Sequence, residues 1–180
     1  GTILEIKSIS TGCSILNNIK LLHCDNTVSD NSDGLCVISP SKTPTLYDVN
    51  FVKNNISGGY YSFYLYYVAN SGSVIGNSSV RIDSNNITDY YYYGIYLYYY
   101  GYYPSVSYNM LSSRTGTSTQ YHLNAYYYVT IDTMQNNIIS MNSTGTQYGI
   151  RLYYNNYYNI KGSTSPRTLA YIVNNEIRQN

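Results

Sequence analysis

The sequence has little charge, no tryptophan and no apolar run long enough to cross a membrane. Only 11% of its 180 residues are charged, with 10 Lys and Arg against 9 Asp and Glu. Phosphate binding needs a basic face, so this balance argues against nucleic acid as a partner. No membrane span is predicted. The chain begins at Gly1 without a Met or a signal peptide, which is typical of a processed product or an excerpt of a longer chain.

Cysteine is also scarce, with only Cys13, Cys24 and Cys36. An odd number does not suit a disulfide framework, and no C-x-x-C pair indicates zinc. Cys13 and Cys36 lie about one predicted repeat apart. There they would stack as a small apolar ladder or, in a secreted protein, form a bridge.

The segment 24–34 has three ligand-type residues shortly before Gly34, as in part of a calcium loop. Aligned on Gly34, the two end-ligand positions fall on Ser29 and Pro40, and both fail as ligands. We therefore interpret the segment as an exposed polar turn. No metal and no cofactor is predicted.

What the sequence does contain is an internal repeat, in which Asn is followed by an aliphatic residue directly or after one residue. It appears in "KNNISG", "SNNITD", "YNMLSS" and "QNNIIS". The Asn nearest to the aliphatic residue in each copy is Asn18, Asn55, Asn86, Asn109, Asn137 and Asn175, at steps of 37, 31, 23, 28 and 38 residues. A period of this size indicates a repeat architecture.

A second element is a short alternating strand: "SFYLYY", "YGIYLYY", "QYHLNA" and "YGIRLYY". A third, "SVRID" or "VTIDT", precedes the Asn element. No segment has a convincing helical period. Units of short strands that cannot bury their own apolar face must stack on copies of themselves. The sequence therefore predicts one all-β domain over 1–180, a solenoid whose residues 1–45 are less regular, as part of a longer chain or of a filament.

Stacked coils would place equivalent residues in columns about 4.8 Å apart. Asn tolerates the left-handed conformation of a tight corner, and stacked amides can bond along the column. We expect a structural ladder of Asn55, Asn86, Asn109 and Asn137. We also expect an inward column of Leu65, Leu97, Leu123 and Leu152, and another of Ile56, Ile87, Ile138 and Ile177.

The strands "YGIYL" and "YGIRL" and the N-N-x-I turns resemble the right-handed parallel β-helix repeat family, which includes pectate lyases, tailspikes and many surface proteins. The resemblance covers about residues 46–180 well and implies a right-handed parallel β-helix. Enzymes of the family act mostly on acidic polysaccharides, and some use a Gly-His-Gly motif and an Arg-Ile-Lys motif. Here the first motif is absent, and "RID" at 81–83 is not the second. No catalytic residue is predicted.

Three residues are nonetheless candidates for catalysis. Asp83 and Asp132 follow equivalent strands and would lie on one face, roughly 10 Å apart by the strand spacing, within reach of an inverting hydrolase. More often, an Asp at a strand end caps the next turn. His122 stands where Gly94 and Gly149 stand in sister units, and we interpret it as a residue of the strand face.

Tyrosine is the abundant residue, with 27 copies against 2 Phe. Its runs follow the strand leucines and predict an outward aromatic stripe that a monomer rarely leaves bare. The candidate binding residues are Tyr64, Tyr66, Tyr96, Tyr98 and Tyr153. The stripe is interpreted as an assembly or adhesion surface, as a sugar-binding platform, or as placeholders for unidentified residues. We expect Tyr96 to stack on Tyr64, with Arg151 at the matching position of a later unit.

The runs Tyr90–Tyr93 and Tyr98–Tyr103 pose a steric problem, because alternation would turn about half of their rings inward or place them in a bulged corner. A phenol is too long for an interior of Ile and Leu, and its hydroxyl would have no partner. We therefore expect a loop here, pinned by Gly101 and Pro104, with its rings packed on a neighbouring coil or subunit.

Taken together, these features predict an extracellular or cell-surface β-helix that is structural or adhesive, non-catalytic and self-associating, as a rod or filament unit. The alternative is a β-helix that binds or degrades polysaccharide. Sequons at Asn55, Asn77, Asn86 and Asn142 mark candidate N-glycans if the protein is secreted by a eukaryote.

Overall fold

The computed structural model describes residues 4–7, 20–22, 33–38, 49–66, 80–99, 101–154 and 171–180. Within these ranges the strands form three sheets. Sheet A contains β1 (Leu4–Lys7), β3 (Asp33–Ile38), β6 (Tyr61–Tyr66), β9 (Tyr93–Tyr98), β12 (Gln120–Tyr126) and β15 (Gln147–Tyr153). Sheet B contains β4 (Val49–Val52), β7 (Val80–Asp83), β10 (Gly101–Ser107), β13 (Val129–Gln135) and β16 (Tyr171–Val173). Sheet C contains β2 (Lys20–Leu22), β5 (Asn55–Ser57), β8 (Asn86–Tyr90), β11 (Met110–Ser113), β14 (Ile138–Met141) and β17 (Glu176–Gln179).

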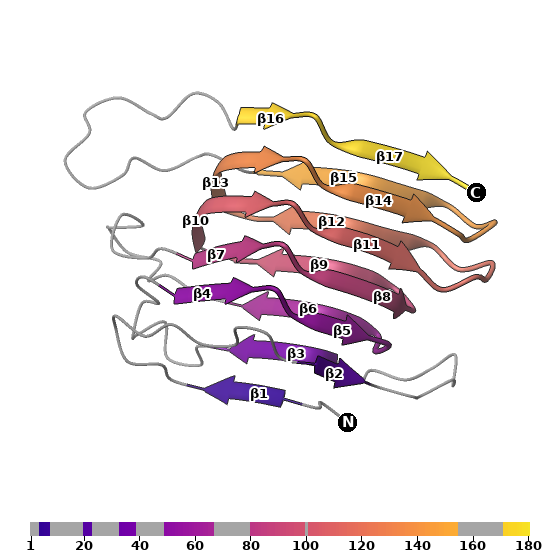
Figure 1. Ribbon diagram of the computed structural model, residues 1–180, viewed down its shortest axis with the longest axis horizontal. Coiled ribbons are helices and arrows are strands. Elements are labelled where there is room, and N and C mark those ends of the chain that lie inside the picture. Colours follow the sequence, from indigo (N-terminus) through magenta and orange to yellow (C-terminus); the bar gives the residue numbers. More distant parts are fainter. Residues whose placement is uncertain are drawn as a thin grey trace.

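From β4 onward the chain visits sheets B, C and A in turn, so each coil adds one strand to each sheet (Figure 1). Every strand pairs in parallel with its equivalent one coil away, as β6 does with β9 and β9 with β12. No helix occurs in the described ranges. The prediction of an all-β parallel solenoid is confirmed.

The core fills the space between the three sheets. In sheet A the buried positions are Ser62, Phe63 and Leu65 of β6 and their register equivalents Gly94, Ile95 and Leu97 of β9. One inward column of sheet A runs through Leu65, Leu97, Ala125 and Leu152. The prediction that Leu123 belongs to it is wrong: Leu123 pairs with Ile95 and Ile150, two residues earlier along the strand. Both columns point inward, so alternation alone could not distinguish them.

Sheet C supplies a further inward column of Ile56, Ile87, Leu111, Ile139 and Ile177. The prediction named Ile138 in place of Ile139. Ile138 instead pairs with Met110 and Glu176, on the outward side of the sheet. The motif "QNNIIS" offers two adjacent isoleucines, and only the second has the inward register.

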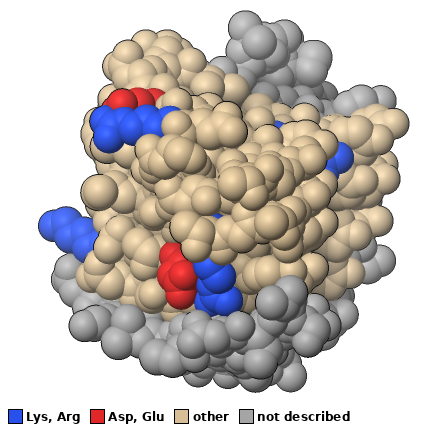
Figure 2. All heavy atoms as spheres, turned by 90° about the vertical axis from the view of Figure 1, so that its right-hand side faces the viewer, with Lys and Arg blue, Asp and Glu red and all other residues tan. Residues whose placement is uncertain are grey.

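Charged groups on the exterior are few and occur in small groups, as Figure 2 shows for one side of the molecule. Arg114 Nε lies 3.3 Å from Asp89 Oδ1, and Arg81 Nε lies 3.5 Å from Asp83 Oδ2. Arg178 pairs with Glu176. Exposed pairs of this kind contribute little to stability, so the fold depends on packing and hydrogen bonds.

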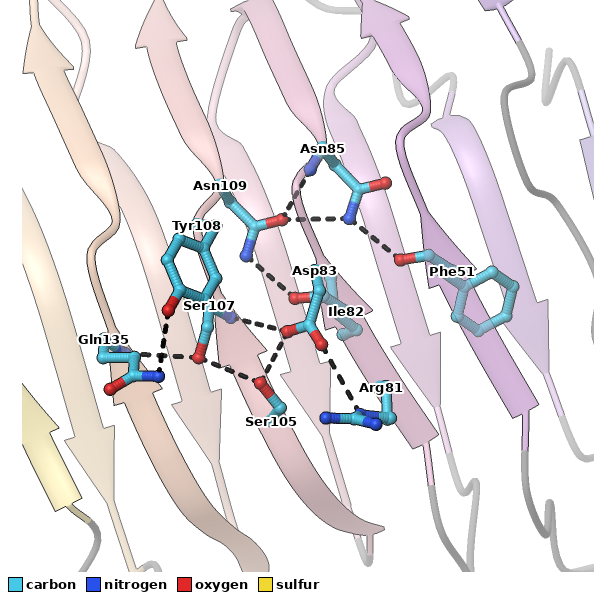
Figure 3. Close-up of polar contacts among 10 residues, drawn as sticks. All are labelled: Phe51, Arg81, Ile82, Asp83, Asn85, Ser105, Ser107, Tyr108, Asn109 and Gln135. Carbon is cyan, nitrogen blue, oxygen red and sulfur yellow. Dashed lines mark hydrogen bonds and ion pairs between the residues drawn. The ribbon is translucent and has the colours of Figure 1, made fainter.

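A ladder of asparagines runs through the corner between sheets B and C. Its members are Asn54, Asn85, Asn109, Asn137 and Asn175. The Asn109 amide donates to Asn137 Oδ1 at 3.0 Å and to the carbonyl of Ile82 at 2.9 Å (Figure 3). Along the ladder, each Oδ1 from Asn85 to Asn175 also accepts the backbone N–H of the preceding member.

Two of the four predicted members of the ladder are wrong. Asn109 and Asn137 lie in it, but Asn54 and Asn85 stand where Asn55 and Asn86 were expected. Asn55 and Asn86 are exposed and pair with each other in sheet C, where Asn86 also pairs with Met110. A single bond of 3.3 Å joins their side chains. The reason is alternation: Ile56 and Ile87 point inward, so the residue directly before each must point outward.

The left-handed residue of each corner precedes the ladder asparagine. Lys53, Ser84, Tyr108, Asn136 and Asn174 have φ between 52° and 60°. Only two of them are asparagines, although Asn is the residue that best tolerates this conformation. In every one of these coils the ladder residue therefore makes hydrogen bonds, while the residue before it makes the turn.

This geometry predicts opposite outcomes for two adjacent asparagines. Asn85 is 1% exposed and bonds to Asn54, Asn109 and the carbonyl of Phe51. Asn85→Ala leaves these buried groups unpaired, which should lower the free energy of unfolding by about 1–3 kcal/mol. The matched control Asn86→Ala, at an exposed site, should change it by less than about 0.5 kcal/mol. Urea unfolding of both variants measures the difference, and equal effects would contradict the ladder.

Candidate functional site: the tyrosine face

The outward side of β6, β9, β12 and β15 is lined almost wholly by tyrosine, and we call it the tyrosine face. Its first column is Tyr61, Tyr93, Tyr121 and Tyr148; its second is Tyr64, Tyr96, Asn124 and Arg151; its third is Tyr66, Tyr98, Tyr126 and Tyr153. All five predicted binding tyrosines lie on this face. Parallel register brings them together, because residues two apart on one strand share a side.

The rings stack along each column rather than lying flat on the sheet. Tyr64 and Tyr96 have ring centroids 5.4 Å apart and planes 12° apart, which confirms the predicted stack. Tyr121 and Tyr148 lie 4.7 Å apart with planes at 4°. Near-parallel rings at this spacing cover each other's faces. The columns therefore present ring edges and hydroxyls to the solvent.

Arg151 is the only Lys, Arg, Asp or Glu in β6, β9, β12 and β15. Its guanidinium carbon lies 5.2 Å from the ring centroid of Tyr126 and 5.4 Å from that of Tyr153. Two more rings, of Tyr121 and Tyr148, lie within 5.8 Å. Such cation–π contacts hold a charge on an aromatic surface.

The tyrosine columns continue into the corner after sheet A. Tyr99, Tyr127 and Tyr154 all have positive φ, at 53°, 59° and 52°. Tyr127 and Tyr154 stack at 5.5 Å with planes at 8°. The Tyr127 N–H donates to the carbonyl of Tyr153 at 2.9 Å, so backbone bonding between coils continues through the corner. A left-handed conformation is rare for bulky residues, and these contacts between coils hold it in place.

Several tyrosines of the face and of its corner have a raised pKa, which keeps the proton on the phenol. Burial, with the neighbouring Tyr99, raises the pKa of Tyr98 to about 12. A hydrogen bond with Tyr126 raises the pKa of Tyr127 to about 12. Burial also raises the pKa of Tyr93 and Tyr96. The face is thus polar through hydroxyls and carries one charge, that of Arg151.

The predicted loop around Gly101 and Pro104 is wrong, because residues 101–107 form β10, which pairs with β7 and β13. Two tyrosines lie inside the coil instead: Tyr103 is 1% exposed and Tyr90 is fully buried. Gly94 helps to make room for the second ring. A Cβ at Gly94 would lie 3.0 Å from Tyr90 Cε1 and 2.6 Å from the carbonyl oxygen of His122.

His122 points into the interior, not onto the outer strand face. It occupies the register of Gly94 and Gly149, as the sequence comparison of the units indicated. Tyr90 Oη bonds His122 Nδ1, and His122 Nε2 lies 3.2 Å from Gln147 Oε1. Burial lowers the pKa of His122 to about 4, although the hydrogen bond with Gln147 by itself raises this pKa. The imidazole is therefore neutral, accepting at Nδ1 and donating from Nε2.

Asp83 and Asp132 do not form a carboxylate pair. In sheet B, Ser105 pairs with Arg81 on one side and with Thr133 on the other. Asp83 lies two residues after this aligned position, and Asp132 lies one residue before it. Asp83 Oδ1 accepts from Ser105 Oγ at 2.6 Å and from the Ser107 N–H at 3.0 Å (Figure 3).

Asp132 has a different partner, because its Oδ2 accepts from Tyr102 Oη at 2.5 Å. The capping interpretation fits Asp83, which ties its strand end to the next coil. Both aspartates directly follow a buried isoleucine, Ile82 or Ile131, and therefore point outward. They lie three residues apart in register, an offset that the matching "ID" of the two strands did not reveal.

Several predicted sites lie outside the described residues: Asn77, Cys13, Cys24 and most of the segment 24–34. Of the other sequons, Asn55 and Asn86 are exposed, whereas the Asn142 amide donates to Ser112 Oγ and to the Ser113 carbonyl. Within the described ranges no three His, Cys, Asp or Glu residues gather as metal ligands would. No helix there is long and apolar enough to cross a membrane.

Comparison with protein-family models, curated proteins and solved structures finds no match for this chain. The resemblance to pectate-lyase-like and tailspike proteins therefore rests on the repeat pattern and the parallel solenoid alone. A shared fold does not assign a function, so function has to be argued from the tyrosine face.

The buried histidine predicts a specific acid sensitivity. The unfolded chain protonates His122 near pH 6.5 and the folded chain only near 4, so stability is present above 6.5 and is lost as the pH falls towards 4. Between pH 7 and 4, the wild type should lose about 3 kcal/mol more than His122→Gln. Urea unfolding across this range tests it, and the carboxylates common to both proteins serve as the internal control. Parallel pH profiles would contradict a neutral buried imidazole.

Proposed function

We propose that this protein is a structural or adhesive solenoid of the cell surface or extracellular space, and that the tyrosine face is its contact surface for further copies of the chain. The observation that carries the proposal is the composition of that face. Three aligned columns cover four strands, and ten of their twelve positions are tyrosine. A broad aromatic surface of this kind marks an interaction site.

The physical state of the rings supports a binding role. Stacking along the columns already restricts the side-chain rotamers, so little further entropy is lost on contact. Tyrosine also combines a large apolar area with a hydroxyl, which makes it frequent in interfaces. At the C-terminal end of the face the rings are most open, with Tyr148 and Tyr153 at 41% and 38% exposed.

A flat sugar-binding platform receives less support from the same geometry. Sugars stack on exposed ring faces, and here neighbouring rings cover those faces, as with Tyr126 and Tyr153 at 4.7 Å and 10°. Contact between copies requires only ring edges and hydroxyls, which the columns offer in regular rows. Asp83 and Asp132 do not support a hydrolase, because each accepts hydrogen bonds from different neighbours: Asp83 from the Ser107 N–H and Asp132 from Tyr102 Oη.

Removing three of the four rings in the third column tests the proposal. Tyr66, Tyr98 and Tyr126 should be replaced together by Thr, which suits outward strand positions. Sedimentation velocity over a concentration series should show association of the wild type and a monomer for the triple variant. Threonine preserves the register, so thermal unfolding should show that the variant still folds.

The matched control is Met110→Thr, on the outward side of sheet C, where Met110 is 54% exposed. This variant should associate as the wild type does. A wild type that stays monomeric at every concentration would contradict the proposal. So would a folded triple variant that associates as strongly as its parent.

A further inference from the structure

One pair of rings on the tyrosine face is arranged for covalent joining. Tyr126 in β12 and Tyr153 in β15 are direct register partners on adjacent coils. Their ring centroids lie 4.7 Å apart with planes at 10°. Tyr153 is 38% exposed and Tyr126 is half-buried. Two phenol rings thus face each other at the surface, where a diffusing oxidant or a partner enzyme has access to one of them.

The surroundings favour oxidation of this pair. The chain has no Trp, so tyrosines are its aromatic one-electron donors. Tyr154 is 56% exposed, and its ring lies 4.6 Å from that of Tyr153, which offers a route for oxidation from the surface. The Arg151 guanidinium carbon lies 5.2–5.4 Å from both ring centroids of the pair, and this cation–π contact helps to hold the two rings in place.

Other neighbours of these rings are placed less well for coupling. Tyr126 and Tyr127 lie 4.3 Å apart, but their planes meet at 76°. Tyr153 and Tyr154 meet at 81°. A perpendicular arrangement brings an edge of one ring to the face of the other. Near-parallel rings, in contrast, bring the ortho carbons of both phenols alongside each other.

We propose that Tyr126 and Tyr153 form a dityrosine cross-link between adjacent coils when a haem peroxidase oxidises the protein with hydrogen peroxide. Each phenol loses one electron and its phenolic proton to give a phenoxyl radical. The radicals join through their ortho carbons, and the two ortho hydrogens then move to the oxygens and restore both phenols. Two hydrogens leave the protein, and one peroxide is reduced to two waters.

The cross-link would close a chain loop of 27 residues (153 − 126). As with a disulfide, such a closure restricts the unfolded chain and so favours the folded state. It would join the coil of β12 to the coil of β15 on the outside of sheet A. The stacked rings already hold the required alignment, so the coils need not move apart.

Trypsin separates the two tyrosines, which makes the product easy to identify. Cleavage after Arg114, Arg151 and Lys161 places Tyr126 in peptide 115–151 and Tyr153 in peptide 152–161. The whole chain is oxidised at low concentration with a haem peroxidase and hydrogen peroxide, and the monomer is isolated and digested. We expect dityrosine fluorescence and a joined peptide pair that is two hydrogens lighter than its parts, with fragmentation assigning the bond to Tyr126 and Tyr153.

Two variants decide the assignment. Tyr153→Phe should lose the joined pair whose bond fragmentation assigns to Tyr126, because phenylalanine has no phenolic hydrogen to give up. Tyr108→Phe is the matched control and should retain it: Tyr108 is 53% exposed but makes no ring contact among the described residues. The proposal is overturned if the oxidised monomer contains no joined pair, if the pair survives in Tyr153→Phe, or if dityrosine forms only between chains.

Discussion

The ladder asparagines Asn85, Asn109 and Asn137 are buried, and their carboxamides bond to the coils on either side. Asn85 shows the full pattern: its oxygen accepts two hydrogens from Asn54, and its amide donates to Asn109 and to the carbonyl of Phe51. A buried amide without partners is costly, so a coil shifted by one residue would lose these bonds. The ladder therefore sets the register of the solenoid, and the inward columns of Leu and Ile follow from it.

The tyrosine face depends on the same register. A shift of one residue would turn its rings inward and the core residues outward. With the register fixed, outward tyrosines meet their equivalents one coil away and stack, and the stack extends into a corner where Tyr127 and Tyr154 have positive φ. The ladder on one corner and the rings on another face thus act together, one through hydrogen bonds and the other through aromatic packing.

The architecture could be predicted from the sequence because period and alternation are properties of many residues at once. Errors arose where one residue decides the outcome. "NN" pairs offer two candidates, and the ladder takes the first in Asn54–Asn55 and Asn85–Asn86 but the second in Asn136–Asn137 and Asn174–Asn175. The signal they share is that the ladder Asn lies two residues before the inward aliphatic residue, such as Ile56 or Ile139. "IIS" gave the same ambiguity for Ile138. The buried Tyr90 was missed because its space comes from Gly94 and its hydroxyl partner from His122, a residue 32 positions away.

Hydrogen exchange of the side-chain amides, followed by nuclear magnetic resonance, tests the ladder most directly. If buried carboxamides set the register, the Nδ2 hydrogens of Asn85, Asn109 and Asn137 should exchange only when the solenoid unfolds as a whole. The Nδ2 hydrogens of Asn86, one position away but exposed, should exchange rapidly. Exchange of Asn85 and Asn109 as fast as that of Asn86 would contradict the account.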